Sequence, residues 1–222
     1  MKTHTEARRL SDTSPQRTPL SEKTRAVQKN DTSHIRSQPL FRQQGVEIQE
    51  FGTLRLLPLA LGMLERQESC QLLNQILADT LVLYHLYKKH HWLMRGHTFY
   101  QLHLLLDKRA NEQLELIDML AERVQTLGGV AIADPRHVAE LTQINRPPDE
   151  VEEVPVMLSR LLEAHEHIID ETREAIRKTG ESADSGTNDL LIGDVLRKHE
   201  LQVWFLAEHL VETPLVRSQP KP

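Results

Sequence analysis

The sequence is poor in cysteine, with Cys70 as the single one among 222 residues. One thiol excludes an internal disulfide framework and a zinc site built from several cysteines. It also suits a reducing compartment, and we interpret Cys70 as a buried side chain that fills space in the core. Covalent cross-links therefore play no part in the expected fold.

Long apolar segments are also lacking. The first 20 residues have no apolar core of the kind that a secretory signal needs. The longest apolar run, residues 54–64, contains Arg55 and Pro58 and is too short to cross a bilayer. We therefore expect a soluble protein located in the cytoplasm.

Aromatic residues make up only 4% of the chain, which is rich in Leu, Glu, Arg and Ala and so favours helices over sheets. Asp134 followed by Pro135 predicts one short helix in a long connection. Apolar periodicity and helix-terminal residues predict four long helices, at about 70–95, 97–127, 155–179 and 188–212. The predicted fold is therefore all-α, a ferritin-like four-helix bundle with a short helix in its crossover.

Charge is distributed unevenly along the chain. Residues 1–45 hold nine Lys or Arg and four Asp or Glu, whereas the remainder holds eighteen and twenty-eight. The first segment has few large apolar residues, so it buries too little surface to offset the entropy of ordering. We assign residues 1–50 to a mobile basic tail, 51–215 to the folded domain and 216–222 to a C-terminal tail. The basic tail either contacts DNA phosphates without sequence specificity or serves only as a solubilising leader.

Metal-ligand patterns that act within one bundle are absent. No Glu is followed three residues later by His, which is the pattern that holds iron inside a single ferritin-like bundle. The H-E-x-x-H pattern is also missing, and "HEH" at 165–167 has the wrong spacing, because residues two apart do not face each other on a helix. We therefore expect that no single bundle brings enough donors within reach of one metal ion.

The helix predicted at 97–127 carries two pairs of donors. His103 and Asp107 are four residues apart, as are Asp118 and Glu122, so the members of each pair share a face. The pairs lie roughly 16 Å apart along the helix, too far for one ion to bind both. Each donor follows a position of the expected apolar stripe, which comprises Leu102, Leu106, Ala110, Leu114, Ile117, Ala121 and Val124.

A second copy of this helix, antiparallel about a two-fold axis, removes the distance problem. His103 then lies level with the partner's Glu122, and Asp107 with the partner's Asp118, because both pairs have the same spacing. His91, near the end of the preceding helix, extends each cluster. Such a shell suits Fe(II), with Zn(II) or Mn(II) as alternative occupants. Taken alone, each pair is better explained as a solvated surface pair.

The neighbours of His91 have weaker claims. Trp92 is placed to shield the cluster from water, but core packing explains this residue better when it is considered alone. We expect His90 and His97 to be exposed or hydrogen-bonded to the backbone.

The stretch "KKHHWLMRGHTFYQLHLLLDKRANEQLELIDMLAERVQTLGG", residues 88–129, resembles the Dps proteins, the miniferritins named as DNA-binding proteins from starved cells. Its HW, LH-x-x-x-D and D-x-x-x-E motifs stand in the family's register, and the similarity of architecture covers roughly residues 65–212. The resemblance implies a hollow shell of twelve chains with ferroxidase centres at two-fold interfaces. The implied ligands are His91, His103 and Asp107 of one chain, with Asp118 and Glu122 of its partner.

The resemblance also implies a function. Family members oxidise Fe(II), usually with hydrogen peroxide in preference to dioxygen, store the ferric mineral and so protect the cell and its DNA. The alternative is a DNA-compacting protein whose metal cluster is inactive or only stabilises the assembly.

Two further groups of residues have open roles. Asp184, Asp189 and Asp194 either line pores that attract Fe(II) or are ordinary acids at a helix N-terminus. Some relatives with long N-terminal arms carry an additional metal site. Its candidates here are Asp31, His34 and Glu50, although glycine stands where another His is wanted.

Overall fold

The structure, a computed structural model, describes residues 45–212. Within this range all regular structure is helical, which confirms the all-α prediction. None of the described helices is long and apolar enough to span a membrane. The predicted C-terminal tail, most of the predicted N-terminal tail, and Asp31 and His34 of the additional metal site lie outside the described residues.

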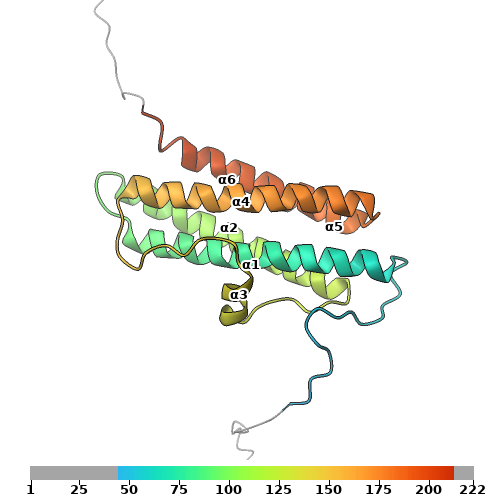
Figure 1. The fold of residues 1–222 in the computed structure, drawn as a ribbon. Helices are drawn as coiled ribbons and strands as arrows, with labels where there is room; N and C mark the ends of the chain where they lie inside the picture. The colour runs from blue at the N-terminus through green and yellow to red at the C-terminus, as the bar shows by residue number, and fades with distance from the viewer. Residues whose placement is uncertain (1–44, 213–222) are drawn as a thin grey trace, which may run out of the picture. The chain divides into compact units, whose positions relative to one another are not determined.

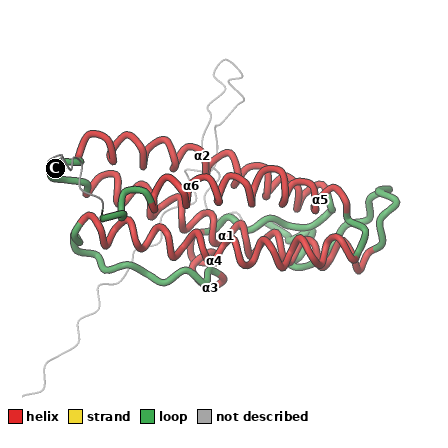
Figure 2. Tube along the Cα trace, turned by 90° about the horizontal axis from the view of Figure 1, so that it is seen from above, coloured by secondary structure: helices red, strands yellow, loops and turns green. Residues whose placement is uncertain are grey.

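The described residues form four long helical segments, which make up the bundle, and a short helix that lies in the crossover (Figure 1). Helices α1 and α4 lie side by side in one layer, with α2 and α6 in the other, as the view from above shows (Figure 2). In chain order the helices are α1 (Met63–Leu93), α2 (Phe99–Thr126), α3 (Pro135–Leu141), α4 (Val154–Glu181), α5 (Ser185–Leu190), the π-helical turn η2 (Leu191–Leu196) and α6 (Arg197–Ala207).

The short helix α3 begins as the sequence predicts. The side chain of Asp134 accepts a hydrogen bond from the backbone N–H of Arg136 at 2.9 Å, and Pro135 occupies the first helical position. Proline costs nothing there, because its missing N–H would have no partner within the helix.

Helix α1 begins at Met63, one to two turns before the expected start near residue 70. Arg66 explains the difference, because its side chain is buried and its guanidinium donates to the backbone carbonyls of Leu57 and Arg55, at 3.3 and 3.2 Å. These bonds hold the incoming segment against the first turn of α1. Apolar periodicity cannot detect a turn whose inward-facing residue is an arginine.

The last segment begins at Ser185 in place of residue 188 and ends at Ala207 in place of residue 212. The Asp184 side chain caps its N-terminus by accepting from the N–H of Thr187 at 3.1 Å. Asn188 instead donates from its side chain to the carbonyl of Ile176 at 2.6 Å, which ties α5 to α4. A helix begins where its free N–H groups find an acceptor, and here Asp184 supplies it.

The apolar stripe predicted on α2 is partly wrong. Leu114 is exposed, whereas Leu116 and Leu120 are fully buried. Arg109 and Gln113 are also buried, because the centre of the bundle holds a polar network. A prediction that counts only apolar residues misses these two buried positions. In the second half of the helix, the predicted stripe is therefore rotated away from the face that is buried.

Side chains of α1 fasten the crossover to the bundle. Asn74 donates to the carbonyl of Val130 at 3.0 Å and accepts from the N–H of Ile132 at 2.9 Å. One turn later, Asp79 accepts from the hydroxyl of Thr142 at 2.5 Å and from the N–H of Gln143 at 2.8 Å. Both ends of α3 are therefore held by buried groups of one helix.

Candidate metal centre

The turn between α1 and α2 brings two predicted ligands together. His91 lies in the last turn of α1 and His103 near the start of α2, and Gly96 makes the reversal with φ of +86°. This backbone conformation strains residues with a Cβ atom. The two imidazole rings stack, with centroids 3.8 Å apart and planes 20° from parallel.

Each of these rings is held by the backbone of the other residue. Nδ1 of His91 lies 2.7 Å from the carbonyl oxygen of His103, and Nδ1 of His103 lies 3.0 Å from the carbonyl oxygen of His91. A carbonyl can only accept, so Nδ1 carries the proton in both rings. In the tautomer that these bonds select, the lone pair of the ring is on Nε2, and a histidine held by its backbone in this way can bind a metal through Nε2.

Asp107, the third ligand predicted from this chain, lies beside His91. Its Oδ1 lies 3.9 Å from Nε2 of His91 and accepts a hydrogen bond of 2.6 Å from Nζ of Lys88. The bond from Lys88 lowers the pKa of the Asp107 carboxyl below its ordinary value. The carboxylate is therefore ionised at neutral pH, and an arriving cation competes with the ammonium group for Oδ1.

The surroundings of the histidine pair differ from expectation. Phe99 stacks on His103 with centroids 5.0 Å apart. Trp92 is 70% exposed, so the expectation of core packing for it is wrong. His90, expected to be exposed or hydrogen-bonded to backbone, is instead fully buried, and burial lowers its pKa to about 4. His97 is exposed, as expected.

Asp118 and Glu122 do not join this cluster within one chain. Both are exposed residues of α2, and Asp118 lies eleven residues beyond Asp107, roughly 16 Å along the helix. The structure therefore brings together His91, His103 and Asp107 and leaves Asp118 and Glu122 on the surface. That the five surround one ion remains a prediction about two chains.

The bundle interior also contains histidines, but these bind one another. Nδ1 of His165 lies 2.8 Å from Nδ1 of His199, and Nε2 of His165 lies 2.5 Å from the hydroxyl of Tyr87. The same hydroxyl donates to Gln202, which also accepts from Gln113. Burial lowers the pKa of His165 well below its ordinary value and that of His199 to about 3. The interior imidazoles are therefore neutral, and the two nitrogens of His165 are both engaged.

Sequence analysis missed one group of donors. Asp79 of α1 meets His167 and Glu171 of α4, with one ligand atom from each lying within 4.8 Å of the others. Three donors of one bundle therefore meet at one point, contrary to the expectation that no single bundle brings enough donors within reach of one metal ion. His167 and Glu171 have the spacing of helix neighbours, four residues, but only the packing of α1 against α4 adds Asp79.

The acids near the start of α5 have separate roles. Asp184 is buried, caps the helix and pairs with Arg123 at 2.6 Å, so the ordinary helix-terminal interpretation is correct for it. A pore role for the exposed Asp189 and Asp194 remains a prediction.

Comparison with known proteins places these features in a wider group. The model of the ferritin-like domain matches residues 70–216. DpsC from Streptomyces coelicolor has a similar structure, with 68% sequence identity and a TM-score of 0.77, and the match covers 78% of this chain and all of that one.

Two more distant relatives agree. An archaeal Dps homologue from Halobacterium salinarum is 30% identical with a TM-score of 0.74, and the match covers 78% of this chain and 97% of that one. A protein of Synechococcus named as a nutrient stress-induced DNA-binding protein is 32% identical over 168 residues, which are 76% of this chain and 95% of that protein.

Proposed function

The chain belongs to the Dps family within the ferritin-like superfamily, and from this premise we propose that it is a ferroxidase and iron-storage miniferritin. Its substrate is Fe(II), its oxidant is hydrogen peroxide, and its product is ferric mineral stored inside a shell of twelve chains. The protein acts in the cytoplasm, where removing Fe(II) and peroxide together protects DNA from oxidative damage.

The observation that carries this proposal is the orientation of His91 and His103. The two rings share a fixed stack, each with Nδ1 bound to a carbonyl and Nε2 left as the basic nitrogen. Both rings are only partly exposed, and the reciprocal bonds hold each of them in one tautomer with Nε2 free of the backbone. Such preorganisation is typical of metal ligands, because an oriented ring binds without a further loss of entropy.

The site needs a second chain to be complete. His91, His103 and Asp107 supply two nitrogens and one carboxylate, which is only part of the shell that iron prefers. Under two-fold symmetry, the partner's Asp118 and the partner's Glu122 add two carboxylates. Asp118 and Glu122 are exposed on α2, which suits this role, since a side chain that binds an ion held by a neighbouring chain must point out of its own bundle.

The chemistry follows from the donor set. Two Fe(II) ions each give one electron to hydrogen peroxide, which takes up two protons and leaves as two water molecules. Carboxylates stabilise the more highly charged Fe(III) product, and the confined site keeps iron and oxidant together until both electrons have moved. The basic Nε2 atoms and the ionised Asp107 attract Fe(II) at neutral pH.

The experiment adds Fe(II) without oxygen to the assembled full-length protein, then hydrogen peroxide, and follows ferric absorbance and peroxide consumption. We expect one peroxide consumed for every two Fe(II) oxidised. A variant with Asp118→Ala and Glu122→Ala should assemble but oxidise iron no faster than buffer does. Equal rates in variant and wild type would reject the proposal.

A second function, nonspecific DNA binding, is favoured by the basic composition of residues 1–45 and by the name of the Synechococcus relative. Phosphate contacts by Lys and Arg release counterions, so binding must weaken steeply with salt. Gel-shift titrations over a salt series test it, with and without residues 1–45. Binding that survives removal of this segment would exclude the tail as the contact.

A further inference from the structure

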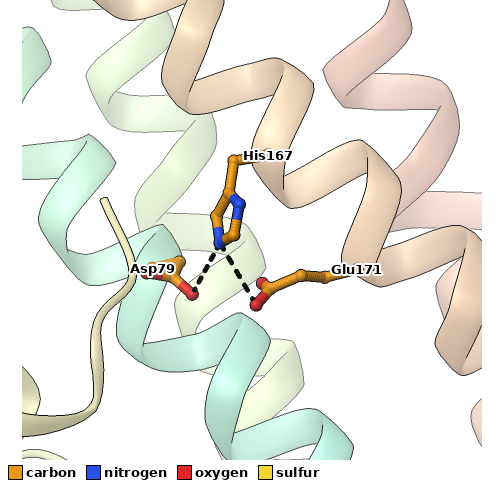
Figure 3. A group of neighbouring side chains, drawn as sticks. All are labelled: Asp79, His167 and Glu171. Atoms are coloured by element: carbon orange, nitrogen blue, oxygen red, sulfur yellow. Dashed lines mark ion pairs between the residues drawn. The ribbon is translucent and has the colours of Figure 1, made fainter. Parts of the chain in front are cut away.

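A compact group of side chains that can bind a metal lies between α1 and α4, in the layer of the bundle that these two helices form. Figure 3 shows Asp79 facing His167 and Glu171, which project from successive turns of α4. Nε2 of His167 lies 3.8 Å from Oδ2 of Asp79 and 3.2 Å from Oε1 of Glu171. One nitrogen and two carboxylate oxygens thus surround a single point.

The two carboxyl groups of this cluster have no basic partner other than His167 among the described residues. The Asp79 side chain is fully buried and that of Glu171 is only 16% exposed, yet in the described part of the chain neither pairs with Lys or Arg. Buried carboxylates are normally paired with a cation or coordinate a metal, because an unpaired buried charge is costly.

The ligand atoms are oriented from outside the group. Oδ1 of Asp79 accepts from the Thr142 hydroxyl and the Gln143 N–H, and Oδ2 accepts from Nε2 of Gln75 at 2.7 Å. Hydrogen bonds of this kind fix a carboxylate in the way that outer partners fix metal ligands. Among the described residues, Nε2 of His167 and Oε2 of Glu171 are buried atoms without a hydrogen-bond partner.

A surface pocket borders one member of the group, His167. A pocket of about 120 Å³ has His167 in its wall, together with Gln143 of the crossover and Arg160 and Glu163 of α4. Its wall mixes polar and apolar side chains, and it borders His167 but neither Asp79 nor Glu171. A small cation can therefore reach His167 without unfolding of the bundle.

We propose that Asp79, His167 and Glu171 bind one divalent transition-metal cation, of the type Zn(II), Mn(II) or Fe(II), inside each chain. One imidazole and two carboxylates match the preferences of these ions, with water filling the remaining positions. This site is independent of the two-fold ferroxidase centre. Because Asp79 also holds Thr142 and Gln143, the bound cation fastens the crossover to α1 and α4.

Zinc is the probe for the first test. Full-length protein is crystallised with Zn(II), and anomalous diffraction at the zinc edge locates the ions. We expect a peak about 2.0 to 2.2 Å from Nε2 of His167 and from one oxygen each of Asp79 and Glu171. A map without a peak there, in crystals whose two-fold centres contain zinc, would overturn the proposal.

Matched variants provide the second test. Glu171→Gln and His167→Gln should each lower the zinc bound at saturation by one ion per chain, measured by titration calorimetry and elemental analysis. Glu163→Gln, one turn before His167 on the same helix, makes the same charge change as Glu171→Gln and should leave the stoichiometry unchanged. Equal stoichiometry in all four proteins would contradict the proposal.

Hydrogen exchange gives a readout that does not depend on activity. Zinc should slow exchange of the Gln143 amide, which is bonded to Asp79, in wild type and in Glu163→Gln but not in Glu171→Gln. Peroxide-driven iron oxidation should be unchanged in Glu171→Gln. Failure of this site and failure of the ferroxidase proposal are therefore separate results.

Discussion

The edge of the bundle and its interior use the same side chains in opposite ways. At the edge, His91 and His103 bind carbonyls through Nδ1 and keep Nε2 basic. In the interior, His165 and His199 bind each other, and Tyr87 takes the remaining nitrogen of His165. The difference teaches that donor type alone does not make a metal site. A site needs lone pairs that the protein leaves uncommitted and a direction from which an ion can arrive.

Carboxylates show the same contrast. Asp107 at the edge has a side chain that is 41% exposed and shares one oxygen with Lys88, so its partner is easily exchanged. Asp184 has a side chain that is 1% exposed and binds Arg123 as well as the N-terminus of α5. The partly exposed pair of Asp107 and Lys88 can give up Lys88 for another cation, whereas the buried pair of Asp184 and Arg123 stabilises the fold.

The largest expected effect tests whether the edge site is shared between chains. Two double variants are made, one with His103→Ala and Asp107→Ala and the other with Asp118→Ala and Glu122→Ala. Each alone should lower the rate of iron oxidation at least about 100-fold, since losing even an outer partner of a ligand costs about 10- to 100-fold. A two-fold pair that contains one chain of each variant has two centres, one with all its ligands and one without. Equal co-assembly should therefore restore about a quarter of the wild-type rate.

The control for this prediction mixes the two variants after each has assembled. No activity should return, because the subunits cannot exchange partners on the time scale of the assay. Absence of recovery in the co-assembled sample would mean that the ligands do not come from two chains.

The next effect concerns the interior ion pair. Asp184→Ala leaves Arg123 partly buried without its carboxylate and removes the cap of α5, which should cost about 3 to 5 kcal/mol in the free energy of unfolding. Asp189→Ala removes an exposed acid five residues later and should change it by less than about 0.5 kcal/mol. Thermal unfolding of both variants decides the matter, and equal melting temperatures would show that Asp184 is no structural anchor.

Acid should affect the interior more than the edge. Burial, with a smaller contribution from Lys198, lowers the pKa of His199 to about 3, against about 6.5 in the unfolded chain. The neutral form is favoured on folding, so its stabilising effect is complete above pH 6.5 and is lost as the pH falls towards 3. The loss should reach about 3 kcal/mol near pH 4, at roughly 1.4 kcal/mol per unit.

Two variants isolate this effect. His199→Gln removes the titrating group and should flatten the decline in melting temperature between pH 6.5 and 4. His165, which belongs to the same network and whose pKa is also lowered by burial, remains in place and keeps part of the slope. His209→Gln removes an exposed histidine and should leave the profile as in wild type. A His199→Gln profile as steep as that of wild type would count against the assignment.

The smallest effect concerns the ammonium group of Lys88, with which a metal cation competes at the edge of the bundle. Lys88→Gln removes the ammonium group that competes for Oδ1 of Asp107. Partly exposed pairs of this kind contribute about 0.2 to 1 kcal/mol, so the affinity of the two-fold site for Zn(II) should rise by roughly 1.5- to 5-fold. Lys108→Gln makes the same charge change at an exposed position beside Asp107 and should have no such effect. Weaker zinc binding in Lys88→Gln would show that Lys88 assists the site.

The parts of the molecule differ in how far sequence reasoning reaches. Local rules located the helices and the start of α3 at Asp134, because caps and periodicity depend on neighbours in the chain. They failed at Met63 and in the second half of α2, where Arg66, Arg109 and Gln113 are buried polar residues. Such residues face inward only because distant segments supply their hydrogen-bond partners.

By itself, the sequence determined the helical class, the family and the reach of His91, His103 and Asp107 toward one edge, since all three follow from short-range spacing and one tight turn. Only the tertiary structure decided which nitrogen of His91 and of His103 keeps its lone pair free. It also decided which histidines bind each other in the interior, and that Asp79 meets His167 and Glu171. These outcomes depend on atoms that are close in space and far apart in the chain. No spacing rule within one helix contains that information.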